Sequence, residues 1–148
     1  MADTNALTDI THTIQLAIAP VFLLTALGTT LTVLTNRLSR IIDRARALEA
    51  KLPTGDEPPP TEVHVELEAL FTRAQMIHRA LNSGVAAALT VCVLIITAFV
   101  GYMAQFNFGI VVAALFIIAM ALFAYALVNF LREAQMSLTS LRFGHRRR

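Results

Sequence analysis

Two pairs of side chains have a spacing that suits a metal ion. His64 and Glu68 lie four residues apart in a stretch expected to be helical, and Asp9 and His12 lie three apart. Each pair supplies only two ligands, whereas protein zinc sites use three or four. We therefore predict no metal site and no bound cofactor, and we expect these polar side chains to lie on the surface in contact with solvent.

The residues that commonly perform catalysis are equally scattered. Cys92 is the only cysteine, so it has no disulfide partner within the chain, and it lies in an apolar stretch where a cysteine usually packs. Hydrolytic or transfer chemistry needs a nucleophile beside a base, or convergent carboxylates. The most apolar parts of the sequence contain no charged residue and no histidine. We therefore predict no catalytic residues and a protein that is not an enzyme.

The composition indicates a membrane protein, because 56% of the residues are hydrophobic. A helix needs about 20 mainly apolar residues to cross a bilayer. Three stretches free of Asp, Glu, Lys and Arg reach that length: 14–34, 85–103 and 109–131. The first is not typical of a cleaved signal peptide, because the residues before it include Asp3 and Asp9 and no basic residue.

The basic residues predict the orientation of these spans. All 12 of them lie in residues 37–79 or in residues 132–148, and none lies in the N-terminal tail or in the turn at 104–108. Loops rich in Lys and Arg stay in the cytoplasm. We therefore expect the N-terminus outside and the C-terminus in the cytoplasm.

A heptad pattern follows the first span and precedes the second. Apolar residues recur at alternating steps of four and three on both sides of the proline-rich segment 53–60, which would interrupt any helix. The predicted seam consists of Leu38, Ile41, Ala45 and Leu48, facing Leu67, Leu70, Ala74 and Ile77 in antiparallel order. The expected charge pairs are Asp43 with Arg73, and Arg46 with Glu66 or Glu68.

The predicted fold class is an all-α membrane protein with three transmembrane helices, the first and second extended into a cytoplasmic antiparallel coiled-coil hairpin. The expected organisation is an outer tail at 1–13, a first span at 14–34, a hairpin at 35–84, a second span at 85–104, an outer turn at 105–108, a third span at 109–131 and a basic cytoplasmic tail at 132–148.

The charged stretch "TNRLSRIIDRARALE", residues 35–49, is therefore interpreted as the solvated and headgroup-facing side of this hairpin. A nucleic-acid surface would be basic with few acids. Here Asp43 and Glu49 interrupt the basic residues, and Glu66 and Glu68 come from the partner helix. We expect no nucleic-acid partner.

Polar residues also recur along one side of the first span. They are Gln15, Thr25, Thr29, Thr32 and Asn36, and the same side continues to Arg40 and Asp43. The opposite side carries a row of leucines. Small and hydroxyl residues often join membrane helices, within a protomer or between protomers. The more specific hypothesis is a pathway through a homo-oligomer, with Arg40 and Asp43 at its cytoplasmic mouth. The residues that would line this pathway are Gln15, Thr25, Thr29, Thr32 and Asn36.

The C-terminal tail ends in Arg146, Arg147 and Arg148. Basic residues close to a membrane exit attract anionic lipid. A topological anchor is one interpretation of this tail, and a site for anionic lipid or for a partner is the other.

Three stretches resemble a known family: "AIAPVFLLTALGTTLTVLTNRLSRIIDRARALE", "LFTRAQMIHRAL" and "FLREAQMSL". The chain is similar over nearly its whole length to a family of small bacterial membrane proteins catalogued as domain of unknown function 2721. The resemblance implies a three-helix protein of the bacterial inner membrane and supplies no activity or functional residues. Three functions remain open: a homo-oligomeric channel or transport subunit, a membrane-anchored adaptor or regulator acting through its helical hairpin, and lipid-linked envelope maintenance.

Overall fold

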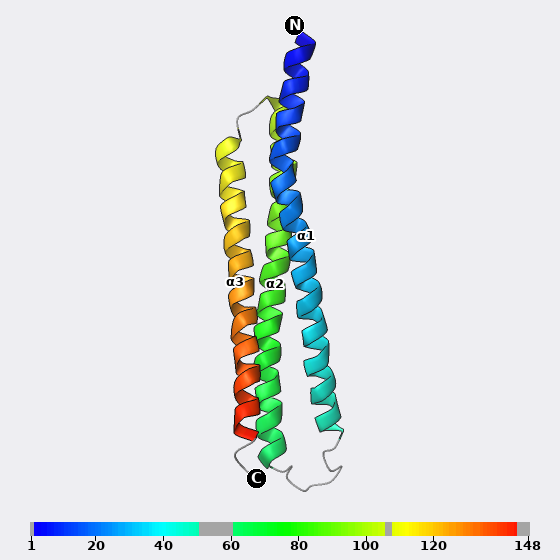
Figure 1. Ribbon diagram of the computed structural model, residues 1–148, viewed down its shortest axis with the longest axis vertical. Helices are drawn as coiled ribbons and strands as arrows, with labels where there is room; N and C mark the ends of the chain where they lie inside the picture. Colours follow the sequence, from blue (N-terminus) through cyan, green and yellow to red (C-terminus); the bar gives the residue numbers. More distant parts are fainter. Residues whose placement is uncertain (1, 51–60, 106–107, 145–148) are drawn as a thin grey trace. The chain divides into compact units, whose positions relative to one another are not determined.

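The computed structural model contains three long α-helices, α1 (Ala2–Glu49), α2 (Thr61–Ala104) and α3 (Gly109–Gly144) (Figure 1). It describes the backbone of residues 2–50, 61–105 and 108–144, and the side chains of residues 18–50, 63–105 and 108–136. Each helix contributes to two compact units. Unit 1 comprises Met1–Leu31 and Ser83–Ala124, and unit 2 comprises Thr32–Asn82 and Tyr125–Arg148.

The helices are long because few residues interrupt them. α1 continues through Pro20, and α2 continues without a break from the charged residues near its start into the apolar residues that follow. α2 ends at Ala104, where Gln105 adopts a left-handed φ of 53° and its amide donates to the Tyr102 carbonyl. A left-handed residue of this kind commonly ends a helix. α3 begins at Gly109.

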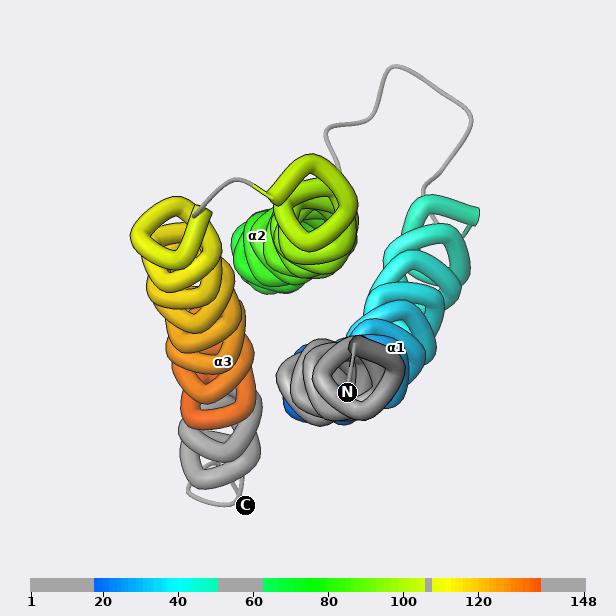
Figure 2. The backbone as a smooth tube through the Cα atoms, turned by 90° about the horizontal axis from the view of Figure 1, so that it is seen from above, coloured from blue at the N-terminus to red at the C-terminus, as the bar shows by residue number. Residues whose placement is uncertain are grey.

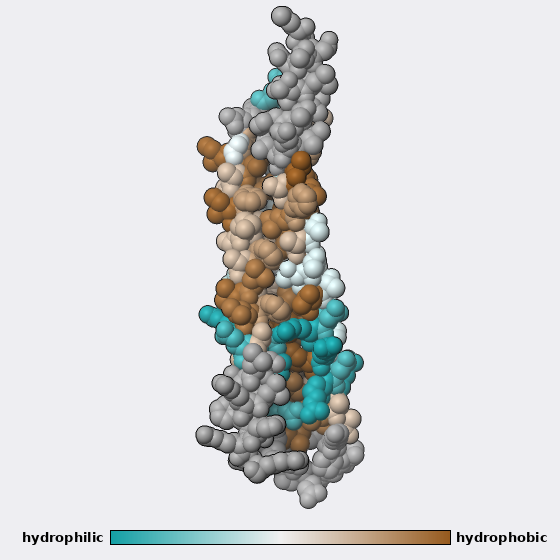
Figure 3. Space-filling view, in the orientation of Figure 1, coloured by the Kyte–Doolittle hydropathy of each residue, from teal (hydrophilic) through white to brown (hydrophobic). Residues whose placement is uncertain are grey.

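All three helices are long and apolar enough to cross a membrane, over Ile18–Glu49, Val63–Ala104 and Gly109–Met136. The prediction of an all-α, multi-pass membrane protein is therefore confirmed at that level. Many large apolar side chains are exposed, including Phe22 and Ile110, and Figure 3 shows hydrophobic residues on much of the visible surface. Such a surface suits contact with lipid.

Unit 1 is built from the first part of α1, the second part of α2 and the first part of α3. Its core is formed by Leu27 of α1, Ala87 and Val91 of α2, and Ala119 of α3. Small residues let the backbones approach closely, as is usual between membrane helices. At Gly84 an added Cβ would lie 2.9 Å from Leu31 Cδ2, so a larger residue would require the Leu31 side chain to shift where α1 approaches α2.

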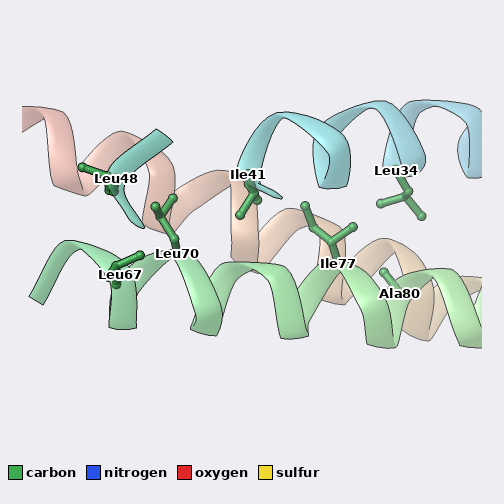
Figure 4. Close-up of a cluster of buried hydrophobic side chains, with 7 residues drawn as sticks. All are labelled: Leu34, Ile41, Leu48, Leu67, Leu70, Ile77 and Ala80. Atoms are coloured by element: carbon green, nitrogen blue, oxygen red, sulfur yellow. The ribbon is translucent and has the colours of Figure 1, made fainter. Parts of the chain in front are cut away.

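Unit 2 is built from the second part of α1, the first part of α2 and the last part of α3. Here α1 and α3 run in one direction and α2 runs in the other, and the segments lie side by side (Figures 1 and 2). The core contains one row from α1 and one from α2, which point toward each other in Figure 4. The residues are Leu34, Ile41 and Leu48 of α1 and Leu67, Leu70, Ile77 and Ala80 of α2.

Two observations in unit 2 differ from the sequence predictions. Glu66 pairs with Arg44 rather than with Arg46, at 2.8 Å. Arg73, for which Asp43 was expected, pairs with Glu133 of α3. Separately, the helix α3 continues past the expected third span at 109–131 to Gly144, into the segment expected to be a basic cytoplasmic tail.

Candidate functional site

The polar residues on one side of α1 are exposed in both units. Thr25, Thr29, Thr32 and Asn36 are all exposed, and the side chain of Gln15 lies outside the described residues. On the opposite side of the helix, Leu27 and Leu34 are each only 1% exposed. The apolar row therefore packs within the protomer, while the polar row is left for lipid, water or another protomer.

The threonine hydroxyls on this side donate to the backbone of their own helix. Thr25 Oγ1 donates to the Val21 carbonyl at 3.2 Å, and Thr29 Oγ1 donates to the Thr25 carbonyl at 3.0 Å. These bonds satisfy the hydroxyl protons locally. The hydroxyl oxygens keep lone pairs that can accept a hydrogen bond or contact a cation.

Arg40 and Asp43 continue the same helix and are also exposed. Within the described part of the chain, neither forms a hydrogen bond or an ion pair. Their opposite charges remain available for solvent, lipid headgroups or a second protomer.

The predicted seam residues occupy the interior of unit 2. Ile41, Leu48, Leu67, Leu70 and Ile77 are buried, with Ile77 at 0% exposure. Leu38, Ala45 and Ala74 pack against them. Phe130 of α3 packs against the same cluster, so the core of this unit includes the third helix as well as the two that the sequence paired.

A buried carboxylate joins all three helices of unit 2. Glu133 of α3 is 1% exposed, and its Oε2 accepts a 2.8 Å hydrogen bond from Nη1 of Arg37 on α1. Its Oε1 accepts two hydrogen bonds from Arg73 on α2, from Nε at 3.2 Å and from Nη2 at 2.9 Å. We call these three residues the Arg37–Glu133–Arg73 cluster.

The cluster carries two positive charges and one negative charge. Burying Glu133 without partners would be costly, because a carboxylate loses its hydration in an apolar interior. The two guanidinium groups compensate for this cost with charge-assisted hydrogen bonds, which are stronger than neutral ones. They remain partly hydrated, with side chains 42% exposed for Arg37 and 23% exposed for Arg73.

A second contact fixes the orientation of Arg37. Its guanidinium carbon lies 4.9 Å from the centroid of the Phe130 ring, one turn before Glu133 on α3. This is a cation–π distance. Because the ring contacts one face of the guanidinium and Glu133 accepts from one edge, these two contacts together restrict the orientation of Arg37.

The sequence analysis missed this cluster. Arg37 and Arg73 were interpreted as parts of the two-helix hairpin, and Glu133 was placed in the basic tail. A signal was present on α3, where Ala119, Ala126 and Glu133 recur every seven residues and all are buried. Small residues at a heptad spacing in a helix of large apolar residues mark the side that packs on neighbouring helices.

The residues considered for catalysis or metal binding lie apart. His64 and Glu68 are both exposed, and among the described residues no three His, Cys, Asp or Glu side chains gather closely enough to hold a metal ion. His78 lies 3.3 Å from the amide nitrogen of Asn82, one turn away. Cys92 is a free, exposed thiol.

Comparison with known proteins gives a family and no function. No curated protein and no solved structure matches the chain. The model of the family DUF2721, described as proteins of unknown function, matches residues 17–143. This match includes the described residues of the polar side of α1, the seam and the Arg37–Glu133–Arg73 cluster, and the chain therefore belongs to the DUF2721 family.

Proposed function

We propose that the protein is a non-enzymatic, homo-oligomeric channel or transport subunit in which the polar side of α1 lines the pathway. One observation carries the proposal: Thr25, Thr29, Thr32 and Asn36 are exposed while the opposite leucine row is buried. Intramembrane polar rows of this kind line water-filled paths when several protomers turn them toward a common axis.

The chemistry of this side suits weak, repeated contact with a solute. Hydroxyl oxygens can replace part of an ion's hydration without the cost of a fixed buried charge. Asn36 has no hydrogen-bond partner among the described residues. An amide without a hydrogen bond is unfavourable in lipid, so contact with water or with a neighbouring protomer would stabilise this side chain. Asp43 would lie at the mouth of the pathway, and Arg40 would lie there at the edge of the polar side. Because their charges are opposite, they do not determine whether the pathway prefers cations or anions.

The test compares ion flux with oligomer size. We expect the Thr29→Leu, Thr32→Leu double variant to lose flux in proteoliposomes while the mass of the detergent-solubilised complex stays unchanged. Val33→Leu is the matched control, because Val33 is exposed on the same helix and is already apolar. A strictly monomeric wild-type protein would refute the proposal. Loss of the oligomer in the double variant would instead assign the threonines to helix association.

The proposed setting is the bacterial inner membrane, with the N-terminus outside and with the hairpin at 35–84 and the C-terminus in the cytoplasm. It is supported by the confinement of Lys and Arg to residues 37–79 and 132–148. The arginines at 146–148, proposed to attract anionic lipid, lie outside the described residues.

We also propose that α1 and α2 form an antiparallel coiled-coil hairpin in unit 2. The facing rows of Figure 4 support this arrangement. In a Cys92→Ser background, cysteines introduced by Leu48→Cys and Leu67→Cys should form a disulfide within one chain. Efficient linking between chains without an intrachain product would mean that the hairpin is open or exchanged between protomers.

One observation favours an adaptor as a second candidate function. Val65 and Phe71 are 62% and 58% exposed on α2, in a part of unit 2 that also carries Glu66, Glu68 and Arg73. Large apolar side chains on a charged surface are common in protein interfaces. A Phe71→Ser variant that keeps its fold but loses a co-purifying protein would support this function, and the absence of ion flux from the intact oligomer would favour it over the channel.

A further inference from the structure

The hydrogen-bonding capacity of Arg37 is only partly used. Nη1 donates to Glu133, and its other N–H groups have no acceptor among the described residues. A guanidinium carries five N–H donors in a rigid plane. Because the side chain is 42% exposed, the remaining donors can reach a ligand from outside the protein.

Arg40 lies almost one turn further along α1, on an adjoining part of the helix surface. It is exposed, and it forms no hydrogen bond or ion pair in the part of the chain that the structure describes. Arg37 shares its charge with Glu133 and Arg73, but that cluster still has one excess positive charge. Arg37 and Arg40 together therefore present a local positive field with unused donors, which matches a phosphate group.

Apolar side chains border this positive field on two helices. Val33 precedes Arg37 by about one turn on α1, and Leu127 precedes Phe130 by about one turn on α3. The two side chains are 45% and 41% exposed. Since α1 and α3 run in the same direction in unit 2 (Figure 1), Val33 and Leu127 both precede the Arg37–Phe130 contact along the direction of their helices. In Figure 3 the hydrophilic side chains over α1 likewise adjoin hydrophobic ones.

We propose that Arg37 and Arg40 bind the phosphate of an anionic phospholipid, with an acyl chain along Val33 and Leu127. A free phosphate ion would use the arginines alone, whereas a lipid uses both the charge and the apolar border. Glu133 and Phe130 hold Arg37 in place, so little conformational entropy is lost when the phosphate binds. The proposed site does not include the arginines at 146–148, and it requires neither a pathway nor an oligomer.

The absence of tryptophan from the sequence provides the assay. Val33→Trp introduces a single tryptophan beside the proposed acyl chain in the full-length protein, and its fluorescence can be excited selectively over that of the two tyrosines. The protein is reconstituted into phosphatidylcholine vesicles that contain a minor fraction of either brominated phosphatidylglycerol or brominated phosphatidylcholine, whose bromines quench tryptophan on contact. We expect the brominated phosphatidylglycerol to quench more strongly, showing preference for the anionic lipid at this position.

Arg40→Gln should lower that preference by about fivefold, the effect typical of one basic residue near an anionic membrane surface. Arg46→Gln is the matched control, because Arg46 is exposed on the same helix beyond Arg40 and should leave the preference unchanged. Equal quenching by the two brominated lipids would overturn the proposal, as would an equal effect of the two arginine variants. Loss of the preference on adding millimolar inorganic phosphate, at constant ionic strength, would overturn the lipid assignment in favour of a free anion. Flux and oligomer mass do not enter this measurement, so its failure is distinct from failure of the channel.

Discussion

Glu133→Gln tests whether the buried carboxylate holds α3 onto the other two helices. The substitution preserves the size of the side chain and removes its charge. The amide oxygen can accept a hydrogen bond from only one side of the pair, while its NH2 group faces a guanidinium that also donates. Arg37 and Arg73 then lose their shared anion and repel each other.

The expected cost follows from the burial of the three partners. Removing one member of a buried ion pair typically destabilises a protein by about 3 to 5 kcal/mol. Glu133 is 1% exposed, but Arg37 and Arg73 are partly exposed and can regain water when the anion is removed. We therefore expect the lower part of this range, about 3 kcal/mol.

Two measurements would detect this loss of stability in the Glu133→Gln variant. Thermal unfolding of the detergent-solubilised protein reports the overall destabilisation, and hydrogen exchange over residues 125–136 reports local release of α3 in unit 2. The control is Glu66→Gln, which breaks the exposed ion pair with Arg44. In this pair the side chain of Arg44 is 56% exposed and that of Glu66 is 46% exposed. An exposed pair of this kind contributes about 0 to 1 kcal/mol.

The comparison between the two glutamate variants is decisive. If Glu133→Gln costs no more than Glu66→Gln, and exchange in α3 stays unchanged, the cluster does not hold α3 and the burial argument is wrong. If Glu133→Gln accelerates exchange over all three helices equally, the cluster stabilises unit 2 as a whole rather than the docking of α3.

Three further predictions concern other parts of the chain. Gly84→Val should destabilise the protein by about 1 to 3 kcal/mol through overpacking against Leu31, and Leu31→Ala should restore part of the melting temperature. Ile77→Ala should cost about 2 to 5 kcal/mol because Ile77 is fully buried, whereas Ile42→Ala, at an exposed position, should cost much less in the same melting experiment. A reporter enzyme that is active only in the cytoplasm should be active when it is fused at Gly55. An externally accessible Gly55 would contradict the proposed orientation.

The length and apolar composition of the helices were sufficient to predict an all-α protein with three membrane-crossing segments. Helix periodicity identifies which residues share a side of one helix. It does not say which neighbouring helix that side meets, and for this reason the third helix was left out of the predicted packing of unit 2.

The charge pairs show the same limit. The sequence placed Arg73 opposite Asp43 because only two helices were being paired. The structure supplies Glu133 from α3, a carboxylate that lies far from Arg37 and Arg73 in the sequence and close to them in space. Sequence reasoning assigned Glu133 to a basic tail, since its immediate neighbour is Arg132 and its burial depends on helices formed by distant segments.

The position of Glu133 suggests why unit 2 contains an ionic cluster where apolar packing alone would be less costly. Apolar and small residues repeat along α3 with a heptad period, so an apolar contact alone would tolerate a slide of α3 by seven residues. Such a slide would bring Ala126 to the position of Glu133, and Arg37 and Arg73 would face each other without an anion. Of these two registers, only the observed one gives both guanidinium groups an anion, and a buried polar side chain that fixes register has precedent in coiled coils. The cluster therefore explains how α3 selects one docking position, and its ordered Arg37 leaves the remaining donors directed toward the lipid site proposed above.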